Sequence, residues 1–271
     1  GNIMSEQQPK FLTALASLFP VLLLLVIDIF ALWLQPQSKA ISHLALGVLT
    51  AQLICLIVFL KGEICNGQRS RLSLVNMYFA IFWVVWFLLS FWSNYHYILT
   101  DFVSVCGLAL VLTTWRQPQE EELRDGLLKI AGLIGTLGVI CYGIVLFDTE
   151  NLIQFNPVAQ ILLGIILANL ALVISRNRLQ SFIALLMLSA IVILALNAIF
   201  VVANLFYFAQ QSAVIFYNEF ALLLYFLLHF IIAAILAAHI FKQWKLSYNT
   251  LIILLFISAS LPLWANFAYT L

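Results

Sequence analysis

The residues most able to do chemistry in this sequence are a few ionisable side chains that lie within or at the ends of long apolar segments. Asp28, Asp101, Glu219 and His229 are the clearest cases. An ionisable group inside a bilayer costs about 2.5–3.5 kcal/mol on insertion scales, so it needs either a partner or a function. These four side chains are therefore the first candidates for binding a proton, a cation or a cationic solute.

Amide side chains in two later apolar segments could line a polar path. Asn197 and Asn204 are seven residues apart and share one face of a helix, and Asn169 and Gln160 lie together in the preceding segment. We take Asn169 and Asn197 as further candidate ligand-binding residues. The alternative is that the amides bond between helices, at about 0.6 kcal/mol each, and that the carboxylates pair at helix ends near water.

Motifs for catalysis or for cofactor binding do not stand out. The sequence has no phosphate loop, no H-E-x-x-H and no G-x-S-x-G. The four cysteines show no C-x-x-C spacing and are expected to be apolar filler. His43 with His96 is the only histidine pair at matched depth that could ligate a haem. We predict no catalytic residue, no metal and no cofactor.

The segments that hold these residues are long enough to span a bilayer. The chain is 65% hydrophobic and 8% charged, with a mean hydropathy of +1.10, whereas a soluble domain carries roughly 25% charged residues. A spanning helix needs about 20 apolar residues, and only helices satisfy their own backbone in lipid. We predict an all-α transmembrane bundle with nine spans, near residues 11–34, 41–60, 73–93, 96–115, 127–147, 153–174, 179–208, 214–241 and 248–270.

Lysine and arginine predict that the N-terminus is inside and the C-terminus outside. In that orientation eleven of the twelve cations fall on the cytoplasmic side, and Lys39 is the exception. The localisation predicted is the cytoplasmic (inner) membrane. Asp28, Asp101 and Glu219 then lie toward the outer face, which predicts an outward-facing polar cavity.

A shift of 139 positions aligns the sequence partly with itself. It lays the segment from Ser42 to Ile54 on that from Ser181 to Ile193, and relates spans 1–3 to spans 6–8. Spans five apart run in opposite directions, so this predicts an inverted repeat, a feature of many secondary transporters. Chance matching of Leu- and Ala-rich helices is the alternative.

Three glycines on the fifth span form a stripe. Gly132, Gly135 and Gly138 are three apart, so another helix can approach there, either within the bundle or from a membrane-protein partner. No linker divides the chain. Because residues 1–3 precede Met4 and look like a protease-cleavage remnant, we expect one transmembrane domain over 4–271.

Three functions are consistent with these patterns. The first is a transporter or permease for a small solute or ion. The second is a non-catalytic anchor, assembly subunit or sensor subunit, and the third is a membrane-embedded enzyme or redox subunit that uses His229 or the His43–His96 pair. We favour the first, with the lipid bilayer and a small solute or cation as partners. A nucleic-acid partner is excluded, because there is no basic patch with interleaved aromatic residues.

Overall fold

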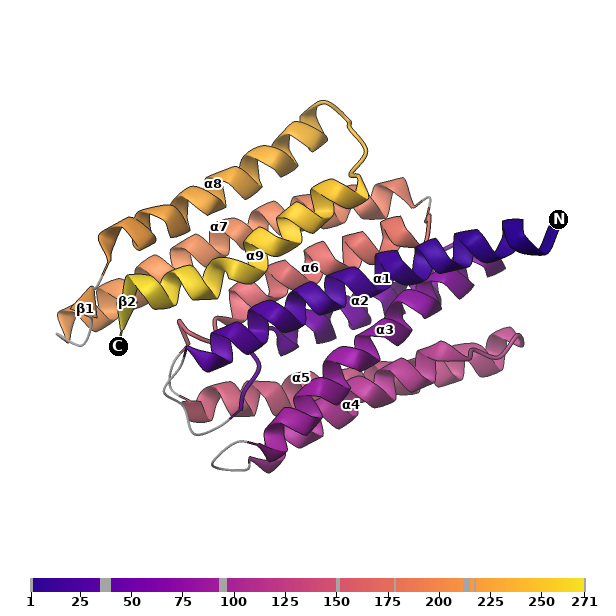
Figure 1. The fold of residues 1–271 in the computed structure, drawn as a ribbon, viewed down its shortest axis with the longest axis horizontal. Helices are drawn as coiled ribbons and strands as arrows, with labels where there is room; N and C mark the ends of the chain where they lie inside the picture. The colour runs from indigo at the N-terminus through magenta and orange to yellow at the C-terminus, as the bar shows by residue number, and fades with distance from the viewer. Residues whose placement is uncertain are drawn as a thin grey trace.

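The protein is a bundle of helices that lie side by side (Figure 1). The computed structural model describes residues 2–34, 40–92, 97–149, 152–177, 179–211, 215–216 and 218–270. This confirms the predicted all-α polytopic bundle. Within the described residues the helices are α1 (Asn2–Trp33), α2 (Ala45–Lys61), α3 (Asn66–Phe91), α4 (Ile98–Trp115), α5 (Glu121–Thr149), α6 (Pro157–Ile174), α7 (Gln180–Gln210), α8 (Glu219–Phe241) and α9 (Tyr248–Ala268).

Eight of the described helices are long and apolar enough to cross a membrane, and α2 is shorter, with 17 residues. Two short strands, β1 (Ile215–Phe216) and β2 (Tyr269–Thr270), pair antiparallel beside the C-terminus. The N-terminus of α1 and the C-terminal ends of α4 and α6 lie toward the right of Figure 1, and α8 runs in the same direction and ends at the top of the picture. We call this cation-rich end the inner end and the opposite one the outer end; their sides of the membrane stay a prediction.

The helix α2 begins later than its hydropathy predicts. It starts at Ala45, and residues 40–44 before it are buried without being helical. The backbone N–H of His43 donates to the Asp28 carboxylate at 2.7 Å, in place of a helical bond. Non-helical backbone at membrane depth is tolerated where protein surrounds it. Asp28 therefore stabilises the non-helical conformation of residues 40–44. This segment leads into α2 at the centre of the bundle.

The helix α6 also begins late, at Pro157 rather than at residue 153. Asn156 caps it, because its side chain accepts the backbone N–H groups of Val158 and Ala159. Proline at the first helical position completes a standard helix start. The N-terminal ends of α2 and α6 thus both lie inside the bundle, near its outer end, and each follows a buried segment.

The pair α2 and α6 forms the centre of the bundle. A Cβ atom at Gly47 would lie 2.8 Å from the Gln160 carbonyl oxygen, and one at Gly164 would lie 2.6 Å from the Gly47 carbonyl oxygen. The two backbones therefore touch, and only glycine permits this approach. The polar groups at the two N-terminal ends are brought together for the same reason.

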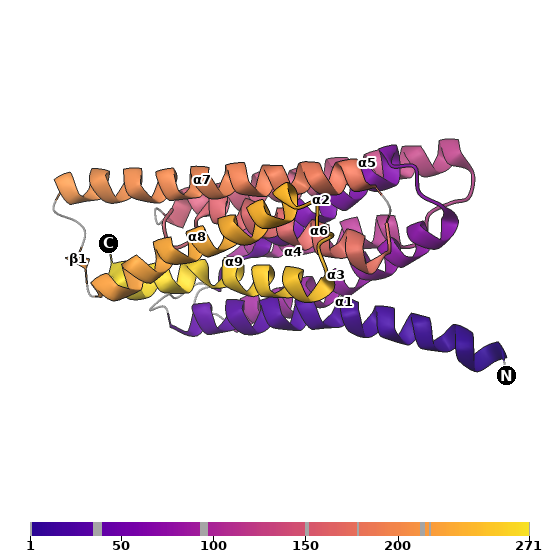
Figure 2. The same cartoon turned by 90° about the horizontal axis from the view of Figure 1, so that it is seen from above.

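The remaining helices surround this pair in two matching sets. The packing of α2 on α5, α3 on α4 and α4 on α5 has counterparts in α6 on α9, α7 on α8 and α8 on α9. In Figure 1, α3–α5 lie on one side of the central pair and α7–α9 on the other. Figure 2 shows α5 and α7 on one face of the bundle and α1 and α9 on the opposite face. This arrangement places α2–α5 and α6–α9 on the two sides of the bundle with several equivalent helix pairings.

Short sequence matches agree with this relation. Gly-x-x-x-Ala-Gln-Leu at 47–53 corresponds to Gly-x-x-x-Ala-Asn-Leu at 164–170, and Thr-Asp-Phe at 100–102 corresponds to Asn-Glu-Phe at 218–220. Helices four apart run in the same direction, so the repeat is parallel, a kind that also occurs in transporters. The packing does not support the inverted repeat of spans 1–3 and 6–8, which stays a prediction.

The glycine stripe on α5 is filled by the chain's own helices. A Cβ atom at Gly135 would lie 2.5 Å from the Leu53 side chain on α2, and one at Gly138 would lie 3.0 Å from Cys106 on α4. A Cβ atom at Gly132 would lie 3.4 Å from the Leu56 side chain on α2. The stripe is therefore not open to a membrane-protein partner, and this corrects the prediction of partner binding through it.

Candidate functional site

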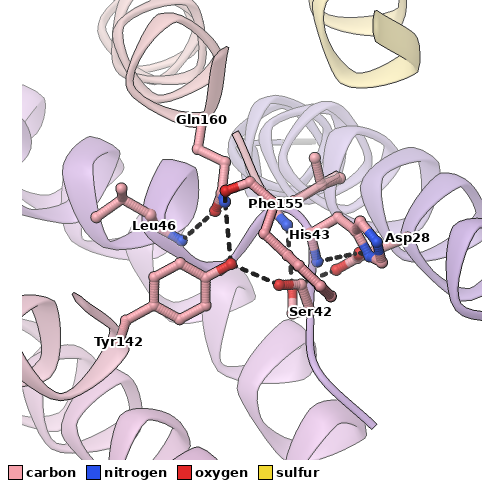
Figure 3. A network of polar contacts seen from close by, with 8 residues as sticks. Asp28, Ser42, His43, Leu46, Tyr142, Phe155 and Gln160 are labelled. Atoms are coloured by element: carbon pink, nitrogen blue, oxygen red, sulfur yellow. Dashed lines mark hydrogen bonds and ion pairs between the residues drawn. The ribbon is translucent and has the colours of Figure 1, made fainter. Parts of the chain in front are cut away.

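Asp28 on α1 is a fully buried carboxylate near the outer end. One oxygen accepts the backbone N–H of His43 at 2.7 Å, and the other accepts the hydroxyl of Ser42. The His43 Nδ1 atom lies 3.6 Å from the first oxygen, and its ring stacks on Phe155 with centroids 4.3 Å apart (Figure 3). These contacts replace the water that an ionised carboxylate would otherwise require.

Further hydrogen bonds connect Ser42 to α5 and α6. The Tyr142 hydroxyl donates to the Ser42 carbonyl at 2.6 Å and accepts from the Gln160 amide at 2.9 Å (Figure 3). The Gln160 amide oxygen accepts the backbone N–H of Leu46 at 2.9 Å. Gln160 on α6 therefore satisfies a donor in the first turn of α2, and the two helix starts are linked directly.

Asn156 carries the connection into the second half of the bundle. The Gln160 amide also donates to the Phe155 carbonyl at 3.2 Å, directly before Asn156. While the Asn156 oxygen caps α6, its amide nitrogen donates to the Asn197 oxygen on α7 at 2.5 Å. One residue thus joins the start of α6 to the middle of α7.

Asn197 completes the connection to α8. Its amide nitrogen lies 3.0 Å from the Tyr225 hydroxyl and 2.8 Å from His229 Nε2, and His229 Nδ1 lies 2.9 Å from the Tyr225 carbonyl. The carbonyl can only accept, so Nδ1 carries the proton and Nε2 accepts from Asn197. His229 is therefore neutral in this arrangement.

The directions of these bonds depend on one another. A second proton on His229 Nε2 would face the Asn197 amide N–H, so Asn197 would have to rotate. Its nitrogen would then face the nitrogen of Asn156, which cannot rotate in turn without giving up the cap of α6. The protonation of His229 is thereby coupled to the start of α6.

We call this connected set the polar chain. It crosses the bundle from α1 to α8 and joins the two halves at the starts of α2 and α6. A cavity of about 20 Å³ borders it beside Ser42 and Tyr142, room for about one water molecule. All its members are buried: Asp28, Ser42, His43, Tyr142, Asn156, Gln160, Asn197, Tyr225 and His229.

The polar chain brings together three of the six predicted site residues, Asp28, Asn197 and His229. Asp101 instead accepts from Ser90 at 2.5 Å, and Glu219 is exposed. Both lie in the first turn of their helices, where a negative charge is stabilised by the helix dipole. Among the described residues, the structure therefore does not collect the three carboxylates around one outward-facing cavity.

Asn169 also lies apart from the polar chain. It is buried on α6, and its amide oxygen has no hydrogen-bond partner among the described residues. Its counterpart in the first half, Gln52, accepts from Trp83 at 2.9 Å and donates to the Gly107 carbonyl at 3.2 Å. The two halves thus differ at equivalent positions.

Sequence reasoning missed several members of the polar chain. Asn156 had a usable signal, because asparagine followed by proline is typical of a helix start. Tyr142 and Tyr225 had none, since tyrosines are common in membrane helices. Of the predicted His43–His96 pair, His96 lies outside the described residues. Within the described part of the chain, no group of three or more His, Cys, Asp or Glu side chains could hold a metal ion.

The fold and its buried polar chain define a multi-pass helical membrane protein. The chain belongs to the integral membrane domain family, whose model matches residues 7–267. It is similar to an uncharacterised protein of Haemophilus influenzae, with 49% identity over 266 residues that cover 97% of this chain and 100% of that protein. No solved structure matches the chain. Both matches extend over nearly the whole bundle, so the polar chain lies inside the matched region.

Proposed function

We propose that this protein is a transporter for a small solute or ion, and that Asp28 binds a proton or cation during transport. The observation that carries the proposal is a carboxylate with no exposed surface inside an apolar bundle, with His43 beside it. Such residues are costly in a membrane and are typically found on ion or proton pathways. A parallel repeat with the polar groups at its interface supports the same function.

The polar chain offers a way to couple the charge on Asp28 to helix movement. A proton or cation on Asp28 would weaken the bonds from Ser42 and the His43 N–H, and so loosen α1 from the segment before α2. Tyr142 and Gln160 join that segment to α6. A change at Asp28 therefore acts directly on the contact between the two halves, where parallel-repeat transporters move.

Transport can be tested with the purified protein in liposomes that contain a pH-sensitive dye. A panel of amino acids, sugars, metal cations and organic cations is added outside, and solute uptake and internal pH are followed. We expect at least one solute to be taken up, and Asp28→Asn to lower its uptake by about tenfold or more, by analogy with other intramembrane carboxylates.

The matched control is Asp101→Asn, which removes a carboxylate at the same end of the bundle that lies in the first turn of α4 and accepts from Ser90. Its uptake should equal that of the wild type. Absence of uptake across the whole panel, or equal uptake by Asp28→Asn and the wild type, would refute the proposal.

A further inference from the structure

A cleft of about 930 Å³ lies at the inner end of the bundle, far from the polar chain. The end of α6 and the first turns of α7 line it on one side. The last turn of α8 and residues 243–246 line it on the other. We call it the inner cleft. Its volume is in the range of ligand sites, which is about 300–1,000 Å³.

The charged residues that line the inner cleft are all cationic. Arg176 and Lys245 belong to its lining, which includes no carboxylate among the residues that the structure describes. Among the described residues neither cation forms an ion pair with a carboxylate. A site with two unpaired cations and no acid favours an anion, and arginine in particular binds phosphate through two parallel bonds.

Asn177 provides an unsatisfied donor in the same lining. The residue is 7% exposed, and its oxygen accepts the Leu179 N–H at 3.1 Å. Its amide nitrogen has no partner among the described residues. A buried donor without an acceptor is costly and rare. An acceptor oxygen of a bound molecule in the cleft would satisfy it.

Backbone strain marks the same place. Arg176 has φ 56° and Gln243 has φ 53°, and they are the only non-glycine residues of the described chain with positive φ. Each follows a helix end of the same kind, with Asn177 N–H bonded to Leu172 O and Trp244 N–H bonded to the His239 carbonyl. Glycine usually occupies this position. Strained residues cluster at ligand sites, and both of these line the inner cleft.

The α7 side of the cleft carries exposed apolar side chains. Leu185 and Leu188 on α7 belong to the lining and are 55% and 54% exposed. Trp244, also in the lining, is half exposed, with Lys242 Nζ 4.9 Å from its ring centroid. Tryptophan and lysine at the end of a membrane helix are typical of the headgroup level. The cleft thus has a cationic end near the headgroups and an apolar side that faces acyl chains.

We propose that the inner cleft binds an anionic phospholipid. Its phosphate lies at Arg176, Asn177 and Lys245, and an acyl chain lies along Leu185 and Leu188. The apolar wall favours a lipid over free phosphate, and the anionic lipids of a cytoplasmic leaflet would meet the inner end. This inference does not depend on transport, because it concerns a separate site.

Native mass spectrometry of the full chain, purified in mild detergent, tests the proposal. The protein is mixed with phosphatidylglycerol, with phosphatidylcholine of the same acyl chains, or with inorganic phosphate. We expect one phosphatidylglycerol per chain, bound about tenfold or more tightly than phosphatidylcholine, because two cations act on the net negative charge. Inorganic phosphate should neither bind stably nor displace the lipid.

Three variants make the test specific. Asn177→Asp keeps the oxygen that caps the backbone but replaces the free donor with a carboxylate, so preference for phosphatidylglycerol should be lost. The double variant Arg176→Gln with Lys245→Gln should lose it too. The control double variant, Lys61→Gln with Lys129→Gln, removes two exposed inner-end cations outside the cleft and should bind as the wild type does.

Equal binding of the two lipids would overturn the proposal. The same conclusion would follow if the control double variant lost as much affinity as the cleft variant, or if phosphate bound in place of the lipid. A thermal melt of each variant shows that it is folded. The Arg176–Lys245 variant keeps the hydrogen bond from the Leu179 N–H to the Asn177 side chain. It therefore tests the lipid site even if Asn177→Asp does not fold.

Discussion

The polar chain at the outer end and the inner cleft meet the same physical problem in opposite ways. Both place polar side chains in an apolar bundle, where each unpaired group costs free energy. In the polar chain, Asp28, Gln160 and Asn197 are bonded to neighbouring side chains and backbone groups. In the inner cleft, Asn177 keeps a free donor beside two unpaired cations. The comparison teaches that the polar chain links helices to one another, while the free donor of Asn177 lines a cleft that has room for a ligand.

The strongest test of the comparison is whether the two ends lie on opposite sides of the membrane. Cys65, at the start of α3, is exposed at the inner end, while Cys55 and Cys106 are buried. We expect a membrane-impermeant maleimide to label Cys65 in inside-out vesicles and not at all in right-side-out vesicles. Labelling of right-side-out vesicles would reverse the two ends, and would place the inner cleft in the other leaflet.

The pH dependence of this labelling is a second readout. The backbone N–H of Gln68 bonds to the sulfur of Cys65 and lowers the pKa of the thiol. Maleimide reacts with the thiolate, so at neutral pH Cys65 should react faster than an ordinary cysteine. The rate should fall only as the pH drops through the lowered pKa. Cys65→Ser controls for labelling of the other cysteines.

Replacing Asn197, the residue with the most side-chain partners, tests how much the polar chain stabilises the fold. Asn197→Ala removes the hydrogen bonds that this side chain makes to Asn156, Tyr225 and His229. At about 0.6 kcal/mol per hydrogen bond in a membrane bundle, the free energy of unfolding should fall by about 2 kcal/mol. Unfolding in mixed detergent micelles measures this.

The matched control is Asn204→Ala, seven residues along the same helix. Asn204 is half-buried, and among the described residues its side chain bonds to the Phe200 carbonyl of its own helix alone. Its replacement should change the free energy of unfolding by less than about 0.5 kcal/mol, as is usual away from networks. An equal decrease in the free energy of unfolding in both variants would mean that the polar chain stabilises the fold no more than an isolated hydrogen bond does.

The bundle itself was predictable, because a lipid-exposed chain has few ways to satisfy its backbone. The start of α2 was not, since Ala40 and Ile41 are as apolar as the helix that follows. The decisive bond there reaches back to Asp28, on another helix. Local hydropathy carries no trace of such a long-range contact. The same limit applies to the parallel repeat, which is clearest in the packing of whole helices.

The two sites differ in how visible they were in the sequence. Asp28, Asn197 and His229 stood out because single polar groups in apolar segments are conspicuous. Arg176 and Lys245 look like ordinary cytoplasmic charges, since cations are expected at that end of every span. What distinguishes both is a cavity between two helix ends, and Arg176 also has a positive φ. These are properties of the folded chain alone.

The smallest expected effect concerns the strain beside the inner cleft. Replacing a left-handed non-glycine residue by glycine relieves about 1 kcal/mol, so Arg176→Gly and Gln243→Gly should each raise the melting temperature of the lipid-free protein. Ser175→Gly, at φ −75°, should lower the melting temperature instead.

On adding phosphatidylglycerol, Gln243→Gly should keep the lipid-dependent rise in melting temperature, because its side chain is not among the proposed phosphate ligands. Arg176→Gly should lose that rise. If neither glycine variant gained stability, the two residues would be ordinary helix ends, and backbone strain would no longer support the lipid site.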